Sequence, residues 1–498
     1  MSDSSSKASP GKAAAAPAAP PVTAADIDAS CRWPLLLLFV SGALWLVAGT
    51  ILSLIVAIKL HKADFLADCP WLTLGRLRPA ATNMFLYGFA SQAGIGVMLW
   101  LMCRLGGVTL VYQWPLAVAW KLWNLGVTVG VVAIMAGAST GFEWLEMPRY
   151  AAGMLFVAYA IIGLCAVATF TMRKEGELFP SQWYLLGAVF WFPWIYSAAN
   201  YLLVVDPVRG TFQSAINAWY AGNLLGLWLG PLALAAIFYF LPRLLGQPLH
   251  SRELAAFGFW TLAFFVNFAG LASLAGGPVP RWMPSVGTVA SVCLLVPLLC
   301  HGLNWHLTCR AACAKGASHS ADPVLRFIFA GALCFLLHGL LTVVMALPKV
   351  SALTQFTYAV VAKNNLALQG FVGLTLIGSV YYILPRLLNA KWPNAGWVQL
   401  HFICTAAGVA LMVVGLLVGG LLQGAKLSDP AAPFITIVRG TVPFIGISTL
   451  GVLLLLIGQG FFLANLGLLL RAFCEPICRA ICADYCGGVP AVKAEVKS

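Results

Sequence analysis

The chain has 498 residues, of which 61% are hydrophobic and only 9% are charged, whereas soluble domains carry roughly 25% charged residues. So few charges exclude a soluble globular enzyme. The net charge of +13 then indicates membrane topology rather than a nucleic-acid-binding surface. Because the apolar runs are continuous and do not alternate, they exclude a transmembrane β-barrel and predict an all-α membrane protein.

The hydropathy pattern divides the chain into two polar ends and a long apolar middle. Residues 1–30 are rich in Ala, Ser and Pro and have no apolar core, so they predict a disordered cytoplasmic tail rather than a signal peptide. Residues 473–498 predict a second, Cys-rich cytoplasmic tail. The membrane domain at 31–472 holds twelve stretches long enough to cross a bilayer: 34–58, 80–103, 112–136, 150–171, 182–205, 217–243, 254–276, 284–309, 324–346, 357–386, 396–422 and 441–471.

The loop charges predict the orientation of these spans. An even number of spans places both termini on one side, and that side carries most of the Lys and Arg outside the spans. Because cytoplasmic loops are enriched in these residues, we expect both termini in the cytoplasm.

Two lysines interrupt the apolar spans, and no Asp or Glu lies near the centre of any span. Lys121 lies in the third span and Lys363 in the tenth. We expect Lys121 to pack against neighbouring helices with a backbone carbonyl as its partner, because a charge at mid-bilayer usually faces protein or water. The lack of carboxylates argues against a proton-coupled transporter.

Six segments of the chain share their order and spacing with one known family. They are LGRLRPAATN at 74–83, GELFPSQWYLLGAVFWFPWIY at 176–196, RGTFQSAINAWYAGN at 209–223, FWTLAFFVNFAGLASLAGGPVPRW at 259–282, LTQFTYAVVAKNNLALQGFVG at 353–373 and YYILPRLL at 381–388. Together with the twelve spans they resemble the catalytic subunit I of heme-copper oxidases, specifically the cbb3 type, over about residues 75–405. That resemblance implies a twelve-helix subunit of a respiratory chain in a bacterial-type inner membrane.

The family patterns R-P-x-H-T-N, W-Y-G-H-N, H-H-L-H-Y and T-D-W-T-I-G-H-V-H-S-G carry the histidines that hold two hemes b and one copper. Carrying them over motif by motif, as the resemblance implies, leaves no histidine at any of six former ligand positions. A redox tyrosine of the family falls on Val266. The former ligand positions are Ala81 and Asn365 for the low-spin heme, Lys363 for the high-spin heme, and Gly222, Ala272 and Ser273 for copper.

These replacements change the chemistry that the family name implies. Ala and Gly have no donor atom, and Ser and Asn are poor ligands for iron or copper. We therefore expect no heme and no copper, although the family would imply both. Oxygen reduction at a heme–copper pair is not supported.

A fold of this kind without porphyrins needs other atoms in its interior. One alternative is closure by large side chains next to the small ones. The other is an apolar cleft that holds lipid or a quinone. The candidate filling residues are Phe264, Phe265, Phe268, Leu271, Leu274 and Phe371.

Lys363, Asn364 and Asn365 form a candidate polar site in the tenth span. In one interpretation Lys363 occupies former heme space and pairs with carbonyls or with the two asparagines. In a second, the three residues line a polar pore or binding site. In a third, a deprotonated Lys363 ligates iron.

None of the seven histidines of the chain stands at one of these six positions. His61, His250 and His319 lie in expected loops, and His401 lies in the eleventh span. His301 and His306 of the eighth span point roughly 140° apart on a helix, so they do not face one metal. A heme held between His301 and His338 of the ninth span is the remaining alternative.

Four cysteines repeat every four residues after the last span: Cys474, Cys478, Cys482 and Cys486. On a helix they form one stripe about 18 Å long, which a single tetrahedral metal cannot span. We expect an apolar stripe on the membrane surface, with Pro476 starting a new interfacial helix. S-acylation and metal binding by i, i+4 pairs are the alternatives.

Three functions remain open from the sequence. The favoured one is a non-catalytic structural subunit of a respiratory complex, contacting membrane lipid and other respiratory subunits or c-type cytochromes, with no nucleic-acid partner. The second is an active terminal oxidase with unrecognised ligands. The third is a small-molecule or ion conduit around Lys363.

Overall fold

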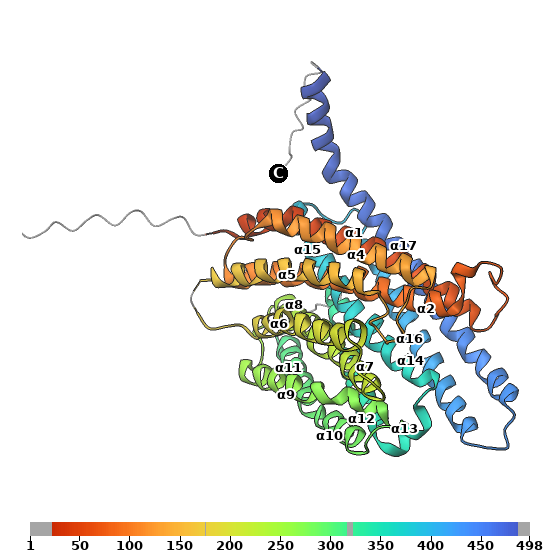
Figure 1. The fold of residues 1–498 in the computed structure, drawn as a ribbon. Coiled ribbons are helices and arrows are strands. Elements are labelled where there is room, and N and C mark those ends of the chain that lie inside the picture. The colour runs from red at the N-terminus through yellow and green to blue at the C-terminus, as the bar shows by residue number, and fades with distance from the viewer. Residues whose placement is uncertain (1–21, 175, 316–321, 487–498) are drawn as a thin grey trace, which may run out of the picture.

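The computed structural model describes residues 22–174, 176–315 and 322–486, without the side chains of 480, 481 and 483–486. Within this part of the chain, twelve helical segments are long and apolar enough to cross a membrane, and there is no strand. The predicted all-α fold of twelve transmembrane helices is therefore confirmed. Figure 1 shows the spans running side by side as one bundle.

Several spans are built from more than one helical element. η2, η3, η4 and η6 are π-helices, and η1 and η5 are 3₁₀-helices. The elements are α1 (Ala24–Lys59), η1 (Pro70–Leu72), α2 (Leu74–Asn83), η2 (Met84–Ala90), α3 (Ser91–Gly106), α4 (Gln113–Ala136), α5 (Arg149–Thr171), α6 (Pro180–Asn200), η3 (Tyr201–Val205), α7 (Phe212–Asn223), η4 (Leu224–Leu229), α8 (Gly230–Leu244), α9 (Arg252–Ala269), η5 (Gly270–Leu274), α10 (Trp282–Cys293), α11 (Leu295–Ala314), α12 (Pro323–Ala346), α13 (Pro348–Thr354), α14 (Tyr358–Asn365), η6 (Leu366–Gly373), α15 (Leu374–Leu388), α16 (Ala395–Leu427) and α17 (Phe434–Cys486).

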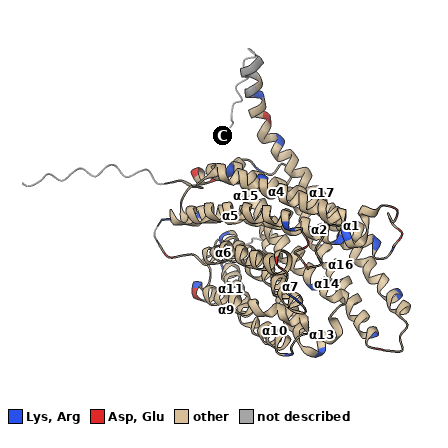
Figure 2. Ribbon diagram, viewed as in Figure 1, with Lys and Arg blue, Asp and Glu red and all other residues tan. Residues whose placement is uncertain are grey.

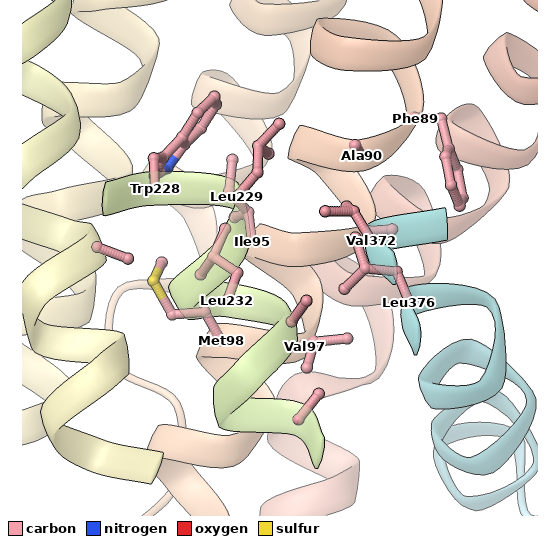
Figure 3. Packing of buried hydrophobic residues seen from close by; sticks show 14 of the residues in the cluster. Phe89, Ala90, Ile95, Val97, Met98, Trp228, Leu229, Leu232, Val372 and Leu376 are labelled. Carbon is pink, nitrogen blue, oxygen red and sulfur yellow. The ribbon is translucent and has the colours of Figure 1, made fainter. Parts of the chain in front are cut away.

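Three spans form the centre of the bundle, and we call them the central spans: α2–η2–α3, α7–η4–α8 and α14–η6–α15. Their most apolar windows are 100%, 83% and 94% buried, while those of the other nine spans are 28–50% buried. Figure 3 shows their side chains interleaving, with Ile95 and Met98 from α3 beside Leu232 from α8, and Val372 from η6 close by. The remaining spans surround this centre and present their outer faces to lipid.

An asparagine precedes every π-helix of the described chain. A π-helix changes the acceptor of each backbone N–H from the fourth to the fifth preceding residue. Just before this change, each asparagine side chain also donates to the carbonyl four residues before it, and we call this arrangement the Asn–π junction. The bonds run from Nδ2 of Asn83 to Pro79 O (2.8 Å), of Asn200 to Tyr196 O (2.9 Å), of Asn223 to Trp219 O (2.8 Å) and of Asn365 to Val361 O (2.9 Å).

The last two spans pack through glycines, as close helix pairs in membranes commonly do. A Cβ at Gly408 would lie 2.7 Å from the carbonyl oxygen of Gly451, and one at Gly415 would lie 2.7 Å from that of Phe444. Any larger side chain at these positions would push α16 and α17 apart.

Both ends of the membrane domain are longer than the sequence predicted. α1 begins at Ala24, so residues 24–30 are helical and not part of a disordered tail. The cause is a capping box: Thr23 Oγ1 accepts from Asp26 N (3.2 Å), and the Asp26 carboxylate accepts from Thr23 N (2.9 Å). The expected tail at 1–21 lies outside the described residues.

At the other end α17 continues through Pro476 to Cys486, so no new helix starts at Pro476. Glu475 supports this turn by pairing with Arg479 at 2.5 Å and, more loosely, with Arg471 at 3.9 Å. Cys474, Cys478 and Cys482 are exposed along it. The Cys486 side chain lies outside the described residues. Figure 1 shows this end of α17 projecting away from the bundle.

Charged residues lie mainly at helix ends and in loops, as Figure 2 shows. Lys121 is an exception and a correction. Its side chain is exposed on the outer face of α4 and does not pack between helices as predicted. The helical register decides this, because Ala119 and Trp123 turn the buried face of α4 the other way.

Candidate functional site

A cavity of about 220 Å³ lies between the sixth, seventh, eighth, ninth and tenth spans. Its lining includes four of the six former ligand positions, Gly222, Ala272, Ser273 and Lys363, and also Val266. These residues come from three different spans, so the fold brings together what the sequence separates by more than a hundred residues. We call this part of the bundle the cavity region.

The two positions that the resemblance assigns to the low-spin heme do not line this cavity. Ala81 is 5% exposed and packs beneath α1, where a Cβ on Gly49 would lie 3.4 Å from the Ala81 carbonyl oxygen. Asn365 bonds to Val361 in an Asn–π junction. The candidate polar site is therefore divided, because Lys363 and Asn364 face the cavity and Asn365 does not.

The loop between α4 and α5, residues 137–148, closes one side of the cavity. Glu143 and Trp144 contribute to the lining, and Trp144 is 6% exposed. Trp144 adopts a left-handed backbone conformation with φ of 63°, which is uncommon for a bulky residue and needs support from its surroundings.

That support comes from all three central spans. Asn83 Nδ2 donates to Glu146 Oε2 at 2.8 Å, and the Tyr87 hydroxyl donates to the Trp144 carbonyl at 2.8 Å. The Glu143 backbone and the Asn217 side chain exchange two hydrogen bonds of 3.1 Å. Asn364 Nδ2 donates to Glu143 Oε1 at 3.1 Å.

The two glutamates of this loop hold protons more tightly than an exposed carboxyl does. Burial raises the pKa of Glu146 to about 7, while the hydrogen bond from Asn83 lowers it in part. Partial removal from water also raises the pKa of Glu143, and the positive charges of Lys363 and Arg78 act in the opposite direction. More than a third of the Glu143 surface stays accessible, and this residue lines the cavity.

Lys363 and His338 are the basic groups of the cavity lining. Within the described chain, the Lys363 amine makes no hydrogen bond or ion pair at contact distance, although it lies within electrostatic range of Glu143 and His338. Among the described residues, His338 Nδ1 is buried without a full hydrogen bond, although the Lys363 backbone lies near the ring, and its Nε2 lies 3.5 Å from Thr342 Oγ1. The cavity therefore offers unsatisfied polar groups to a ligand or to water.

The rest of the cavity wall is apolar, and part of the predicted filling is wrong. Phe371 lines the cavity as expected and packs on Phe335, with ring centroids 5.0 Å apart. Phe264 and Phe268 are instead 63% and 42% exposed on the outer face of α9. Because α9 turns Val266 toward the cavity, Phe264 and Phe268, two residues before and after it, point to the opposite side of the helix, where they line an apolar groove with Trp194, Trp219 and Trp282.

Two histidines that are candidates for replacement ligands, His301 and His401, form hydrogen bonds with protein groups instead. His301 is buried, with Nε2 bonded to the Tyr184 hydroxyl at 2.5 Å and Nδ1 to the Pro297 carbonyl. Neither nitrogen is free to share a heme with His338. His401 Nδ1 is bonded to the Tyr381 hydroxyl at 2.8 Å. His306, His250 and His61 are exposed.

These residues do not fit a heme–copper pair. His338 is the single imidazole in the cavity lining, and nowhere in the described ranges do three or more His, Cys, Asp or Glu side chains come together in a metal-binding group. Drug-sized ligands occupy pockets of roughly 300–1,000 Å³, and a porphyrin belongs to the large end of that range. A cavity of about 220 Å³ is too small for it.

The sequence did not predict Glu143 or Glu146 as members of this site, and it predicted His338 only as a heme ligand together with His301. The glutamates belong to a loop, where hydropathy gives no sign that a carboxylate is buried. Two asparagines in the facing spans, Asn83 and Asn364, bind them. The motif GFEWLEM, with two acids among large apolar residues, was the available signal.

Comparisons with known proteins agree with this architecture. Residues 34–454 match the family described as Cytochrome C and Quinol oxidase polypeptide I. The chain is 26% identical over 445 residues to a cytochrome c oxidase subunit 1 homolog, bacteroid, of Bradyrhizobium diazoefficiens, covering 86% of this chain and 80% of that protein. It is 24% identical over 390 residues to the Cbb3-type cytochrome c oxidase subunit CcoN1 of Stutzerimonas stutzeri, covering 76% and 81%.

A solved structure shares the fold at lower sequence identity. A cryo-EM structure of a heme-copper terminal oxidase dimer aligns with a TM-score of 0.71 and 13% identity, covering 88% of this chain and 84% of that one. The family match extends across most of the chain, including every former ligand position. The protein with this cavity at its centre therefore belongs to the cytochrome c and quinol oxidase polypeptide I family.

Proposed function

We propose that this protein is a non-catalytic member of its family, a membrane subunit that folds without heme or copper and associates with other subunits of a respiratory complex. The observation that carries the proposal is the composition of the six former ligand positions, where Ala, Gly, Ser, Lys and Asn stand. A protein that kept the helices and lost the ligands is under selection for its shape and contacts.

The surroundings of these positions support the proposal. Ala81 is packed under α1, and the cavity region offers one imidazole beside a lysine and a glutamate. When protonated, the Lys363 amine at the expected iron-ligand position has no free electron pair for a metal ion and repels it by charge.

Metal and heme content of the purified protein tests the catalytic part of this proposal. We expect less than roughly a tenth of a heme and of a copper per chain, measured by pyridine hemochrome absorbance and elemental analysis. A family relative prepared from the same host, with its histidines intact, serves as the loading control. Stoichiometric heme in this protein would refute the proposal.

The partner part has its own test. Membranes solubilised in mild detergent should yield this protein together with catalytic oxidase or c-type cytochrome subunits, identified by mass spectrometry. A monomer that carries no respiratory subunit at any detergent concentration contradicts the association.

A second function is supported by Lys363. An amine in an otherwise apolar span, facing a cavity beside Glu143 and His338, is the arrangement of a small-molecule or ion conduit. The carboxyl of Glu143, the amine of Lys363 and the imidazole of His338 are all able to exchange protons with water that enters the cavity.

Proton flux into liposomes tests this second function. Protein reconstituted with an internal pH-sensitive dye should pass protons under a potassium diffusion potential, and Lys363→Leu should lower the rate at least tenfold. Lys121→Leu removes a lysine from the outer face of α4 and is the matched control, expected to leave the rate unchanged. A wild-type rate equal to that of empty liposomes eliminates the conduit.

A further inference from the structure

The three central spans end in the same short pattern. Near the last turn of each, an aromatic residue is followed four positions later by an arginine, and the stretches YFLPRLL at 239–245 and YILPRLL at 382–388 differ at a single residue. All three spans run in the same direction, so the three ends meet at one face of the bundle. The pairs are Trp100 with Arg104, Tyr239 with Arg243, and Tyr382 with Arg386.

Each arginine lies over the ring of its own pair, with the guanidinium carbon 5.1, 5.8 and 3.4 Å from the ring centroid in chain order. The rings themselves form one cluster. Trp100 lies 5.7 Å from Tyr239 and 5.9 Å from Tyr382, measured between centroids. Arg243 Nε also donates to the Tyr382 hydroxyl at 2.9 Å, so two of the arginines share one tyrosine.

The positive charge of this arginine cluster, Arg104, Arg243 and Arg386, is only partly balanced. Asp28 of α1 pairs with Arg104 at 2.5 Å and accepts from Trp100 Nε1 at 2.9 Å. It is the one carboxylate that pairs with the cluster in the described ranges. Arg32 of α1 adds another guanidinium, donating to the Leu387 carbonyl at 2.6 Å.

Helix capping accounts for part of this arrangement. Cations stabilise helix C-termini, and Arg386 Nη1 donates to the Tyr382 carbonyl at 2.7 Å. Capping needs one guanidinium per helix end and does not require that the three ends meet around shared rings. Three converging guanidiniums repel one another, and each has N–H donors without an acceptor among residues 22–174, 176–315 and 322–486, including the buried Nε of Arg104.

We propose that the arginine cluster binds a phosphate-bearing anion. Guanidinium groups donate paired N–H bonds that match phosphate oxygens, and a tetrahedral phosphate presents oxygens to several donors at once. Arg243 and Arg386 are more than a third exposed, so an anion reaches them from the aqueous side. The phosphate comes either from an anionic lipid headgroup or from a soluble compound.

Binding to the full-length protein in nanodiscs tests this site. One arm titrates inorganic phosphate and pyrophosphate into nanodiscs of phosphatidylcholine and follows thermal unfolding. The other arm measures retained phosphatidylglycerol by native mass spectrometry. Binding in the first arm assigns a soluble phosphate, and binding in the second arm alone assigns a lipid headgroup.

Variants locate the binding. The double variant Arg243→Gln/Arg386→Gln loses two charge-assisted contacts and should weaken the binding at least tenfold. The matched control Arg252→Gln/Arg310→Gln removes two exposed arginines elsewhere and should change the affinity less than twofold. If the first variant does not fold, Arg243→Lys keeps the charge without the paired donors and should still weaken the binding.

Equal weakening in the cluster and control variants would show unspecific charge attraction and overturn the proposal. So would a wild type that binds neither phosphate nor phosphatidylglycerol. Neither outcome bears on heme content, so this inference and the proposed function fail separately.

Discussion

Two regions of the bundle stand where the family resemblance implies hemes, and they differ in packing. Ala81 is 5% exposed, its neighbours Leu77, Ala80 and Phe85 are also buried, and none of them lines the cavity. We call this the packed region. In the cavity region, Gly222, Ala272 and Lys363 surround about 220 Å³ of open space. The positions that the resemblance assigns to ligands are therefore packed in one region and open onto an amphipathic cavity in the other.

The two regions differ in the kind of side chain that lines them, and this difference indicates what each region does. The packed region has the character of an ordinary membrane-protein core, where small residues let helices approach. The cavity region contains Glu143, Lys363 and His338, which are costly next to lipid and gain nothing from packing alone. Polar groups around open space indicate a ligand or water, whereas a packed core indicates only shape.

One substitution made at two former ligand positions gives the largest expected contrast. Ala81→Leu inserts three carbons into the packed region and should destabilise the protein by about 3 kcal/mol. Ala272→Leu extends into the cavity and should change stability by less than about 0.5 kcal/mol. Unfolding midpoints of the two variants in detergent measure the contrast. Equal losses would mean that the two regions do not differ in packing.

The pH dependence of stability tests the loop that closes the cavity. The carboxyl of Glu146, with its pKa raised to about 7 from the usual 4.5, binds a proton more tightly in the folded protein than in the unfolded chain. Ionisation therefore destabilises the fold, so the stability contributed below pH 4.5 is lost as the pH rises through 7. The loss between pH 5 and 8 should be on the order of 2 kcal/mol.

Glu146→Gln keeps an acceptor for Asn83 and should remove this pH dependence. Glu177→Gln, at a carboxylate whose side chain is 90% exposed, should leave it in place. A wild-type unfolding midpoint that is constant from pH 5 to 8 contradicts the assignment.

A double-mutant cycle measures how strongly the charges of the cavity region are coupled. Lys363→Met and Glu143→Gln each remove one charge, and together they remove both. Because the two groups make no direct ion pair and Glu143 is partly exposed, we expect a coupling of about 0.5–1 kcal/mol at pH 8. Chemical unfolding of the four proteins gives the coupling. If the two changes in unfolding free energy are strictly additive, Lys363 and Glu143 do not interact.

The smallest expected difference in stability is between alanine variants of two adjacent asparagines, Asn364 and Asn365. Asn365→Ala removes the bond to the Val361 carbonyl at an Asn–π junction and should cost about 1 kcal/mol. Asn364→Ala removes a more exposed bond to Glu143 and should lower the unfolding free energy by only a few tenths of a kcal/mol. The order of the two unfolding midpoints decides between these assignments, and a reversed order would place Asn364 in the structural core.

Hydropathy alone predicted the number and approximate bounds of the spans, because long apolar runs are the strongest signal in a membrane sequence. It did not predict the start of α1 at Ala24, which depends on the capping box at Thr23. Nor did it predict the continuous α17, since proline is tolerated inside this helix. Nor did it predict the π-helices, because hydrophobic periodicity does not show where an α-helix changes to a π-helix.

The sequence predicted those members of the candidate site whose polarity differs from that of the residues around them. Lys363 stands out in an apolar span, and the structure places it in the cavity lining. Glu143 and Glu146 were not found, because a loop that folds inward is a tertiary event. Phe264 and Phe268 were assigned to the interior, but the face that α9 turns outward is decided by its neighbours and not by its own composition.

The Asn–π junctions have a consequence for biogenesis. At each π-helix of the central spans the asparagine bonds to a carbonyl of its own span, and under the proposed function the chain would fold without waiting for a prosthetic group. In a heme-starved host this protein should therefore accumulate at its normal level, while an intact oxidase that depends on cofactor loading is degraded. Immunoblots of membranes from such a host measure this, and a parallel fall of both proteins would show that maturation still depends on heme supply.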